Sequence, residues 1–299
     1  MRTVYLGTSG FAADVLERLA ATPHRPLLVV TRPDRPRGRG QKLAPPPVAE
    51  TARLLGIELV QPGDLHAEET RAAIRDADPE TVCICSFGAI IREPLLSEHE
   101  MLNVHPSLLP RWRGAAPIER AIEAGDDETG VTIMRPTAEV DAGPVCLQRS
   151  DAIRPDDDFG TLSARLAALG GELLVEALDL RPPFREQPEE GVTYAEKIER
   201  DDRRLDPELM PDELERRVRA LRPHVGAYVE LPSGEPLGVV RAALTAEDGP
   251  DPGELSERDG RLLYGAAGGA LELLEVHPAG KRPMGAADWL RGHAARLAG

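Results

Sequence analysis

Two short apolar runs, Leu27-Leu28-Val29-Val30 and Val82-Cys83-Ile84-Cys85, decide the fold class of this 299-residue chain. Near-continuous apolar runs of this length are typical of strands in a parallel sheet that is covered on both faces. Val4-Tyr5-Leu6 and Leu102-Asn103-Val104 are further runs with strand character. The sequence therefore predicts a sheet whose strands are spread over the first third of the chain.

Amphipathic segments with helical spacing separate these strands. We expect helices at Phe11–Ala21, Pro46–Leu55, His66–Asp76 and Pro117–Ala124. Two more strands at Val131–Met134 and Val145–Gln148 and a long helix at Phe159–Leu180 complete the series. Because strands and helices alternate from Thr3 to about Asp179, the sequence predicts an α/β domain with a doubly wound parallel sheet.

The sequence changes character after Arg181-Pro182-Pro183, because these prolines end the long helix. Beyond a charged linker, a helix is expected at Pro211–Leu221. Short strands with Gly and Pro turns favour a small β-barrel after it. The strands are expected at Tyr228–Leu231, Gly238–Val240 and Leu271–Leu274, and a last helix at Gly285–Leu297. The predicted division is a catalytic domain 1–187, a linker 188–205 and a C-terminal domain 206–299.

Length and composition indicate a two-domain cytoplasmic protein. A chain of 299 residues is long enough to form two domains, each with its own core. No apolar run could span a bilayer, and Met1–Gly7 leads directly into a strand without the regions of a signal peptide. Cys83 and Cys85 would lie on the same face of a strand as small buried side chains. They lack the further ligands that a metal site needs, so no metal is expected.

The net charge of −15 opposes a nucleic-acid partner, but one loop has the opposite charge. Between residues 32 and 42 a single acid accompanies five basic residues, Arg32, Arg35, Arg37, Arg39 and Lys42. A focused basic loop on an acidic protein can still bind phosphates locally.

Polar side chains suited to acyl transfer follow one of the predicted strands. Asn103 and His105 lie at the end of that strand, where doubly wound sheets bind their ligands. Asp141 falls in the loop between the two strands predicted next. Asn and His can donate hydrogen bonds to a developing oxyanion, and a carboxylate can accept a proton from an attacking amine. These three residues are the candidate catalytic residues.

The segment Asn103-Val104-His105-Pro106-Ser107-Leu108-Leu109-Pro110, followed by Val140-Asp141-Ala142-Gly143, resembles the folate-dependent formyltransferases. The resemblance implies a Rossmann-like catalytic domain followed by an OB-like β-barrel domain, with 10-formyltetrahydrofolate as the formyl donor. It also implies catalytic roles for Asn103, His105 and Asp141. The family includes enzymes that act on glycinamide ribonucleotide, on amino-sugar nucleotides and on the folate itself, so this motif leaves the acceptor open.

Two further segments are similar to those of the methionyl-tRNA branch of this family. They are Arg111–Ile118 and the basic loop Arg32–Leu43, and the resemblance continues through Tyr194–Ile198 to Pro278–Lys281. It implies methionyl initiator tRNA as the acceptor and a monomer as the working form. Pro106 departs from the usual pattern of this branch, in which Gly is more frequent after the histidine.

The resemblance also assigns binding residues. The wall of the folate pocket would be Ser107, Leu108, Leu109 and Pro110, and its pterin end would include Phe87 and Gly88. Leu108 and Leu109 could equally be ordinary packing residues. Arg39 would be the principal reader of the tRNA acceptor stem and Lys42 a phosphate contact, with Lys281 and Arg282 as candidates in the C-terminal domain.

Two alternatives remain at this point. A formyltransferase acting on an amino-sugar nucleotide would share the chemistry but would not need the basic loop. A catalytically silent tRNA-binding protein would share the fold, but the intact set of Asn103, His105 and Asp141 disfavours it.

Overall fold

The computed structural model describes residues 1–37, 40 and 42–293, which form two compact units. The N-terminal unit comprises Met1–Pro117, Glu128–Ala152 and Ser163–Ala195. The C-terminal unit comprises Ile118–Asp127, Ile153–Leu162 and the chain from Glu196 onward. Each unit therefore draws on several separate stretches of the sequence.

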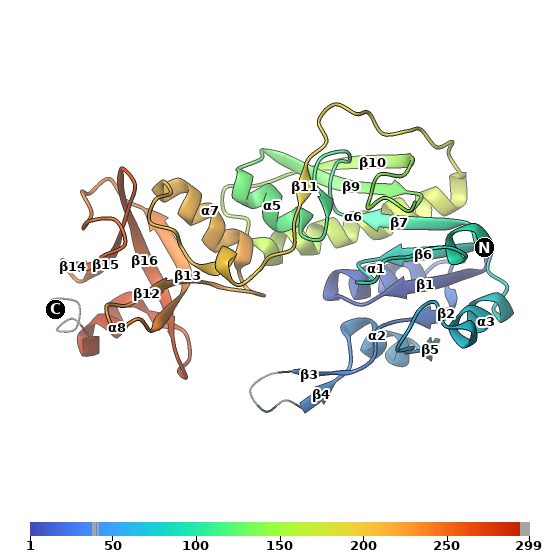
Figure 1. Cartoon of the computed structure of the whole chain (residues 1–299), viewed down its shortest axis with the longest axis horizontal. Coiled ribbons are helices and arrows are strands. Elements are labelled where there is room, and N and C mark those ends of the chain that lie inside the picture. Colours follow the sequence, from blue (N-terminus) through green and yellow to red (C-terminus); the bar gives the residue numbers. More distant parts are fainter. Residues whose placement is uncertain (38–39, 41, 294–299) are drawn as a thin grey trace. The chain divides into compact units, whose positions relative to one another are not determined.

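A seven-stranded sheet forms the centre of the N-terminal unit (Figure 1). Its order is β10 (Val145–Ala152), β9 (Glu128–Met134), β7 (Met101–His105), β6 (Thr81–Cys85), β1 (Thr3–Gly7), β2 (Pro26–Val30) and β5 (Glu58–Val60). The strands from β7 to β5 are parallel, whereas β9 and β10 are antiparallel to their neighbours. The predicted doubly wound α/β sheet is confirmed; the edge strand β5 was not predicted.

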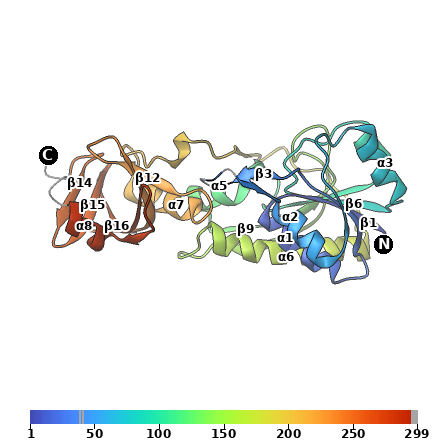
Figure 2. The same cartoon turned by 90° about the horizontal axis from the view of Figure 1, so that it is seen from below.

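Helices cover both faces of this sheet (Figure 2). They are α1 (Gly10–Ala20), α2 (Pro47–Leu55), α3 (Glu68–Asp76), α4 (Leu95–Glu98) and α6 (Phe159–Leu180). Ile74 of α3 and Leu95 of α4 share one core with Val4, Val82 and Met101 on the sheet. On the opposite face a Cβ at Gly170 of α6 would lie only 2.9 Å from the Val104 side chain, so this glycine lets α6 approach β7 closely.

The strand order reverses between β1 and β6, which places a switch point at their carboxyl ends. The turn after β1 is bonded to the turn after β6, because the Thr8 hydroxyl donates to the Phe87 carbonyl oxygen across 2.7 Å. Ser9 then caps α1 by accepting a hydrogen bond from the Ala12 N–H. Ligands of doubly wound sheets bind at such a point, and β7 is the next strand along.

The C-terminal unit is built on a fully antiparallel sheet. Its order is β12 (Ala227–Glu230), β13 (Pro236–Leu244), β16 (Gly269–Pro278), β15 (Arg261–Ala266) and β14 (Leu255–Arg258), with β17 (Met284–Gly285) also paired to β16. The helices α7 (Pro211–Leu221) and α8 (Ala286–His293) bury Leu214, Val218 and Trp289 against it. The C-terminal domain of short strands that the sequence predicts is confirmed, and its strands are antiparallel.

Two small sheets complete the N-terminal unit. The hairpin of β3 (Arg35–Arg37) and β4 (Lys42–Ala44) extends from this unit as an arm (Figure 1). The strand β8 (Arg113–Gly114) pairs in parallel with β11 (Tyr194–Ala195). This second pair brings the segment after α6 back beside the chain that follows β7. Among the described helices, none has the length and apolarity to cross a bilayer.

Candidate active site

Asn103 and His105 project from the same face of β7, because alternate residues of a strand share a face. Met101 shares that face and packs in the core with α3 and α4. Among the described residues, the Asn103 amide donates only to the thioether sulfur of Met134, at 3.6 Å. A thioether is a weak acceptor, so this amide has most of its donor capacity free for a ligand.

His105 is buried, and each of its ring nitrogens faces a different group. Nε2 lies 2.8 Å from the carbonyl oxygen of Trp112, which can only accept, so Nε2 carries the proton. Nδ1 lies 3.6 Å from Asp141 Oδ2. That distance exceeds a hydrogen bond but suits an ion pair when the ring gains a second proton. The structure therefore brings His105 and Asp141 together, as the sequence analysis required.

Asp141 lies in the loop between β9 and β10 with a left-handed backbone, φ 49°. Its carboxylate accepts a hydrogen bond of 3.0 Å from the Gly114 N–H of β8. Two residues later, a Cβ at Gly143 would lie 1.9 Å from the Arg135 carbonyl oxygen, so only glycine fits there. The path of this loop is thus fixed on both sides of the carboxylate.

The turn from Ser107 to Pro110 is held by two side chains of β9 and β10. The Thr132 hydroxyl donates to the Ser107 carbonyl oxygen at 2.7 Å and accepts from the Leu109 N–H at 3.2 Å. Gln148 donates to the Leu109 carbonyl oxygen at 2.7 Å. Ser107 is fully buried and its hydroxyl is bonded to the Arg111 carbonyl oxygen, and Leu109 is also buried. Leu108 and Pro110 are the partly exposed members of the turn.

Phe87 and Gly88 follow β6 at the switch point. The Phe87 ring is buried in the sheet core with Val4 and Leu6, and its carbonyl oxygen is bonded to Thr8. Gly88 has φ 75°, a conformation that glycine adopts without strain. The predicted pterin residues are thus near the position at which doubly wound sheets bind ligands.

Of the predicted tRNA contacts, Lys42 belongs to the β3–β4 hairpin. Lys42 is exposed on β4, and its Cα pairs with that of Arg37 on β3. Arg39 lies outside the described residues. The hairpin places Lys42 away from the core of the sheet, on the arm described above.

Several residues that shape the site were not predicted. Arg113 and Gln187 contact each other beside the Asp141 loop, and Thr132 and Gln148 hold the turn after β7. Thr193 accepts a hydrogen bond from the Trp112 N–H at 2.9 Å. For Thr193 a signal was present, since it adjoins the segment at Tyr194 that resembles the family.

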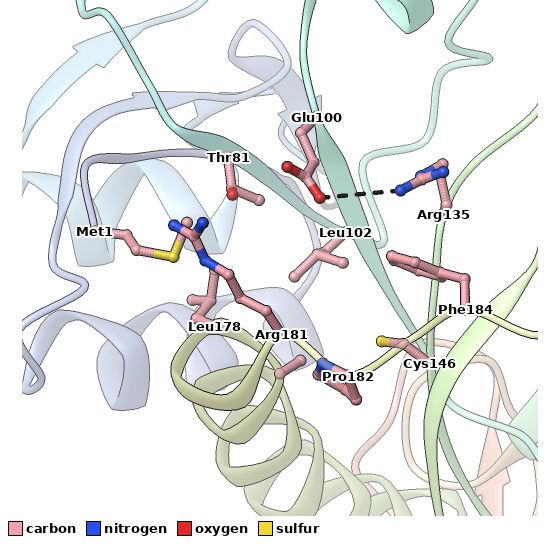
Figure 3. A pocket seen from close by; sticks show the side chains of 11 residues that line it. Met1, Thr81, Glu100, Leu102, Arg135, Cys146, Leu178, Arg181, Pro182 and Phe184 are labelled. Atoms are coloured by element: carbon pink, nitrogen blue, oxygen red, sulfur yellow. Dashed lines mark ion pairs between the residues drawn. The ribbon is translucent and has the colours of Figure 1, made fainter.

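A cavity of about 230 Å³ lies at the opposite, amino end of the strands (Figure 3). Glu100 and Arg135 form an ion pair of 3.9 Å at its wall, and Arg135 stacks over the Phe184 ring. Cys146 also lines it, and burial raises the pKa of this thiol to about 11. The charged groups of Glu100 and Arg135 are thus already paired, and the cavity is separate from the end of β7 that carries Asn103.

The described cysteines are free and buried, as expected for small apolar side chains. Burial raises the pKa values of Cys83 and Cys85 to about 12, so both thiols stay protonated at neutral pH. Within the described part of the chain, no cluster of three His, Cys, Asp or Glu side chains is arranged to hold a metal ion.

Comparisons with known proteins agree on one family. Residues 1–178 match the family described as formyl transferase, and residues 197–294 match the formyl transferase C-terminal domain. The methionyl-tRNA formyltransferase of Methylococcus capsulatus is 44% identical over 302 residues, which covers 98% of this chain and 97% of that protein. The methionyl-tRNA formyltransferase of Halorhodospira halophila is 41% identical, covering 97% of this chain and 96% of that protein.

A solved structure shows the same fold. HypX from Aquifex aeolicus, in complex with tetrahydrofolic acid, superposes with a TM-score of 0.64 at 21% identity. The match covers 99% of this chain and 48% of that larger one. The two domain matches and the relatives above 40% identity establish that the chain belongs to the formyl transferase family.

Proposed function

We propose that this chain transfers the formyl group of 10-formyltetrahydrofolate to the free α-amine of methionyl initiator tRNA. The observation that carries the proposal is the placement of Asn103, His105 and Asp141 around the carboxyl end of β7, in a chain that matches methionyl-tRNA formyltransferases over nearly its full length. The product, N-formylmethionyl-tRNA, would serve translation initiation in the cytoplasm.

The reaction forms one bond and breaks another. The neutral amine of the methionyl group attacks the formyl carbon, and the carbonyl electron pair moves onto oxygen. When this tetrahedral intermediate collapses, the bond from carbon to N10 of the folate breaks. The amine loses a proton and N10 gains one, so the site must move a proton as well as stabilise an oxyanion.

The Asn103 amide is the proposed donor to the oxyanion, because the acceptor it contacts in the structure is the weak Met134 thioether. Removal of one such donor typically lowers turnover roughly 100- to 1000-fold. A donor that points to a strong internal acceptor would have to break that bond first. The weak contact of Asn103 avoids this cost.

His105 and Asp141 are the proposed route for the proton. Since Nε2 donates to the Trp112 carbonyl oxygen, the lone pair of neutral His105 is on Nδ1, facing Asp141 Oδ2. A proton released by the amine can be held between these two groups and returned to N10. While Nδ1 holds it, the imidazolium adds positive charge beside the oxyanion.

The folate is proposed to bind along the turn after β7 and the turn after β6. Ser107, Leu108, Leu109 and Pro110 would form its wall, and Phe87 and Gly88 its pterin end. Ser107 and Leu109 are buried, so they would fix the main chain of the turn. Leu108 and Pro110 are partly exposed, so their side chains could contact the folate.

The tRNA is proposed to contact the β3–β4 arm, with Arg39 reading the acceptor stem and Lys42 binding a phosphate. Lys281 and Arg282, both exposed in the C-terminal unit, are further candidates. We retain residues 1–187 as the catalytic part, 188–205 as the linker, 206–299 as the tRNA-binding part, and a monomer as the working form. Arginine suits base edges as well as phosphates, and lysine suits phosphates.

Acceptor choice is the direct test of this proposal. Formyl transfer from 10-formyltetrahydrofolate would be measured with methionine-charged initiator tRNA, a charged elongator tRNA and an amino-sugar nucleotide in parallel. Product on the initiator tRNA alone supports the proposal. Product on the sugar nucleotide alone keeps the chemistry of Asn103 and His105 but rejects the tRNA role, and absence of product on every acceptor rejects the enzyme.

A further inference from the structure

Gln187 links Arg113 of β8 to the main chain of the loop that carries Asp141. It follows α6 in the N-terminal unit, and its amide is used at both ends. Its carbonyl oxygen accepts from Arg113 Nε at 3.1 Å and from Arg113 Nη2 at 2.9 Å. Its Nε2 donates to the Asp141 carbonyl oxygen at 2.7 Å and to the Gly143 carbonyl oxygen at 2.8 Å.

The loop held by Gln187 needs such support. Asp141 has φ 49°, a left-handed conformation that is strained for a non-glycine residue and persists where the surrounding contacts hold it in place. Gly114 fixes the carboxylate from one side, and Gln187 fixes the main chain of the same residue from the other. Asp141 is thus held at its carboxylate and at its carbonyl group by two different segments.

Arg113 orients Gln187 in turn. The Arg113 side chain is 9% exposed, and its Nη1 lies 3.7 Å from the exposed carboxylate of Glu139. A guanidinium only donates, so it fixes which end of the Gln187 amide carries the oxygen. The amide nitrogen is left facing the loop carbonyls, with both of its protons used.

We infer that Gln187 is a positioning residue, which holds the Asp141 carboxylate at its distance from His105 while Arg113 sets the orientation of the Gln187 amide. This inference rests on the catalytic role proposed above for Asp141. The hydrogen bonds of the Gln187 amide go to Arg113 and to the main chain at Asp141 and Gly143. Its effect on turnover should therefore pass entirely through Asp141.

Gln187→Glu tests the contacts at the two ends of the amide independently. A carboxylate at this position keeps the contact with Arg113, but it has no proton for the carbonyl oxygens of Asp141 and Gly143 and repels them. We expect kcat to fall about 10- to 100-fold, as for an ångström-scale misplacement of a catalytic group. The KM values for 10-formyltetrahydrofolate and for methionyl-tRNA should stay close to those of the wild type.

A double-mutant cycle with Asp141→Asn distinguishes positioning from a general structural role. If Gln187 acts through Asp141, the double variant is no slower than Asp141→Asn alone. Losses that multiply, or a Gln187→Glu variant with wild-type kcat, would overturn the inference. Glu186→Gln, an exposed neighbour with the opposite change of charge, is the matched control and should keep wild-type kcat.

Two further measurements keep the result interpretable. Thermal unfolding of each variant reports whether it folds, and if Gln187→Glu does not, the near-isosteric Gln187→Met removes the same hydrogen bonds without repulsion and enters the same cycle. If Asp141→Asn keeps wild-type turnover, the proposed role of Asp141 fails. If Asp141→Asn is slow and the Gln187 variants are not, only the present inference fails.

Discussion

Thr132 of β9 donates its hydroxyl proton to the carbonyl oxygen of Ser107 across 2.7 Å, which ties the turn after β7 to the antiparallel part of the sheet. Thr132 is fully buried, and its hydroxyl also accepts from the Leu109 N–H and from Gln148. One side chain therefore satisfies several polar groups of the proposed folate wall, where water has no access to replace it.

Thr132→Val should destabilise the protein and weaken folate binding together. The substitution keeps the shape of the side chain but leaves the Ser107 carbonyl oxygen without that donor, at a cost of about 1–3 kcal/mol in the free energy of unfolding. Urea unfolding and the KM for 10-formyltetrahydrofolate would be measured. Thr129→Val is the matched control on the same strand, because the buried Thr129 hydroxyl has no partner among the described residues. An equal loss in both variants would contradict the prediction.

Asn103→Ala should lower activity while leaving the stability of the protein nearly unchanged. We expect turnover to fall roughly 100- to 1000-fold, the usual effect of losing one oxyanion donor. The free energy of unfolding should change little, because the lost hydrogen bond is the weak one to the Met134 thioether. Single-turnover formyl transfer and urea unfolding test both halves of the expectation. Turnover within a few-fold of the wild type would remove Asn103 from the mechanism.

Lys42→Ala should raise the KM for methionyl-tRNA and leave the KM for the folate unchanged. Loss of one phosphate contact should also reduce the slope of log affinity against log salt by about 1. Arg181→Ala is the control, since it removes one exposed positive charge at the amino end of the strands. If both variants weaken tRNA binding equally, the effect is one of net charge, and the arm has no special role.

Asp158→Asn should destabilise the C-terminal unit in a pH-dependent way. Burial raises the pKa of Asp158, but the hydrogen bond from the Thr161 N–H and the pairing with Arg222 outweigh it and leave the pKa below its usual value. A lowered folded-state pKa stabilises the protein above the unfolded-state pKa, and this stabilisation is lost as the pH falls through the folded value.

The Asp158→Asn variant should therefore be less stable than the wild type by about 2 kcal/mol at pH 7. The difference should shrink steadily as the pH falls below about 4, where the carboxyl of the unfolded chain already takes up protons. Urea unfolding at several pH values measures it. Asp156→Asn, an exposed neighbour, should show no such trend, and a difference that does not depend on pH would count against the ionised carboxylate as its cause.

The parallel sheet could be predicted from the sequence because its central strands are buried on both faces. Thr81–Cys85 and Pro26–Val30 are nearly all buried, and their apolar runs reflect this directly. The edge strand Glu58–Val60 pairs on one side only and has two apolar residues, so it gave no such signal. The hairpin of β14 and β15 was missed although its turn, Asp259-Gly260, is a typical hairpin dipeptide.

The candidate site was predictable where chemistry and a strand end coincide. Asn103 and His105 have that placement, and the structure brings Asp141 to His105 from the loop after β9. Gln187 could not be found in this way. It contacts Asp141 from 46 residues away through its amide, in a segment without periodicity, and nothing in a linear pattern records such a contact.

The C-terminal unit is built from separate stretches of the sequence, and this has a practical consequence for fragments of the chain. Within that unit the Arg216 guanidinium donates to the Glu123 carbonyl oxygen, and His224 pairs with Glu119 at 2.9 Å and stacks on Phe159. These partners come from residues 118–127 and 153–162. A protein truncated to residues 206–299 would lack all of them. Cutting the chain once does not yield two intact folding units, and the halves should regain native stability only when expressed together.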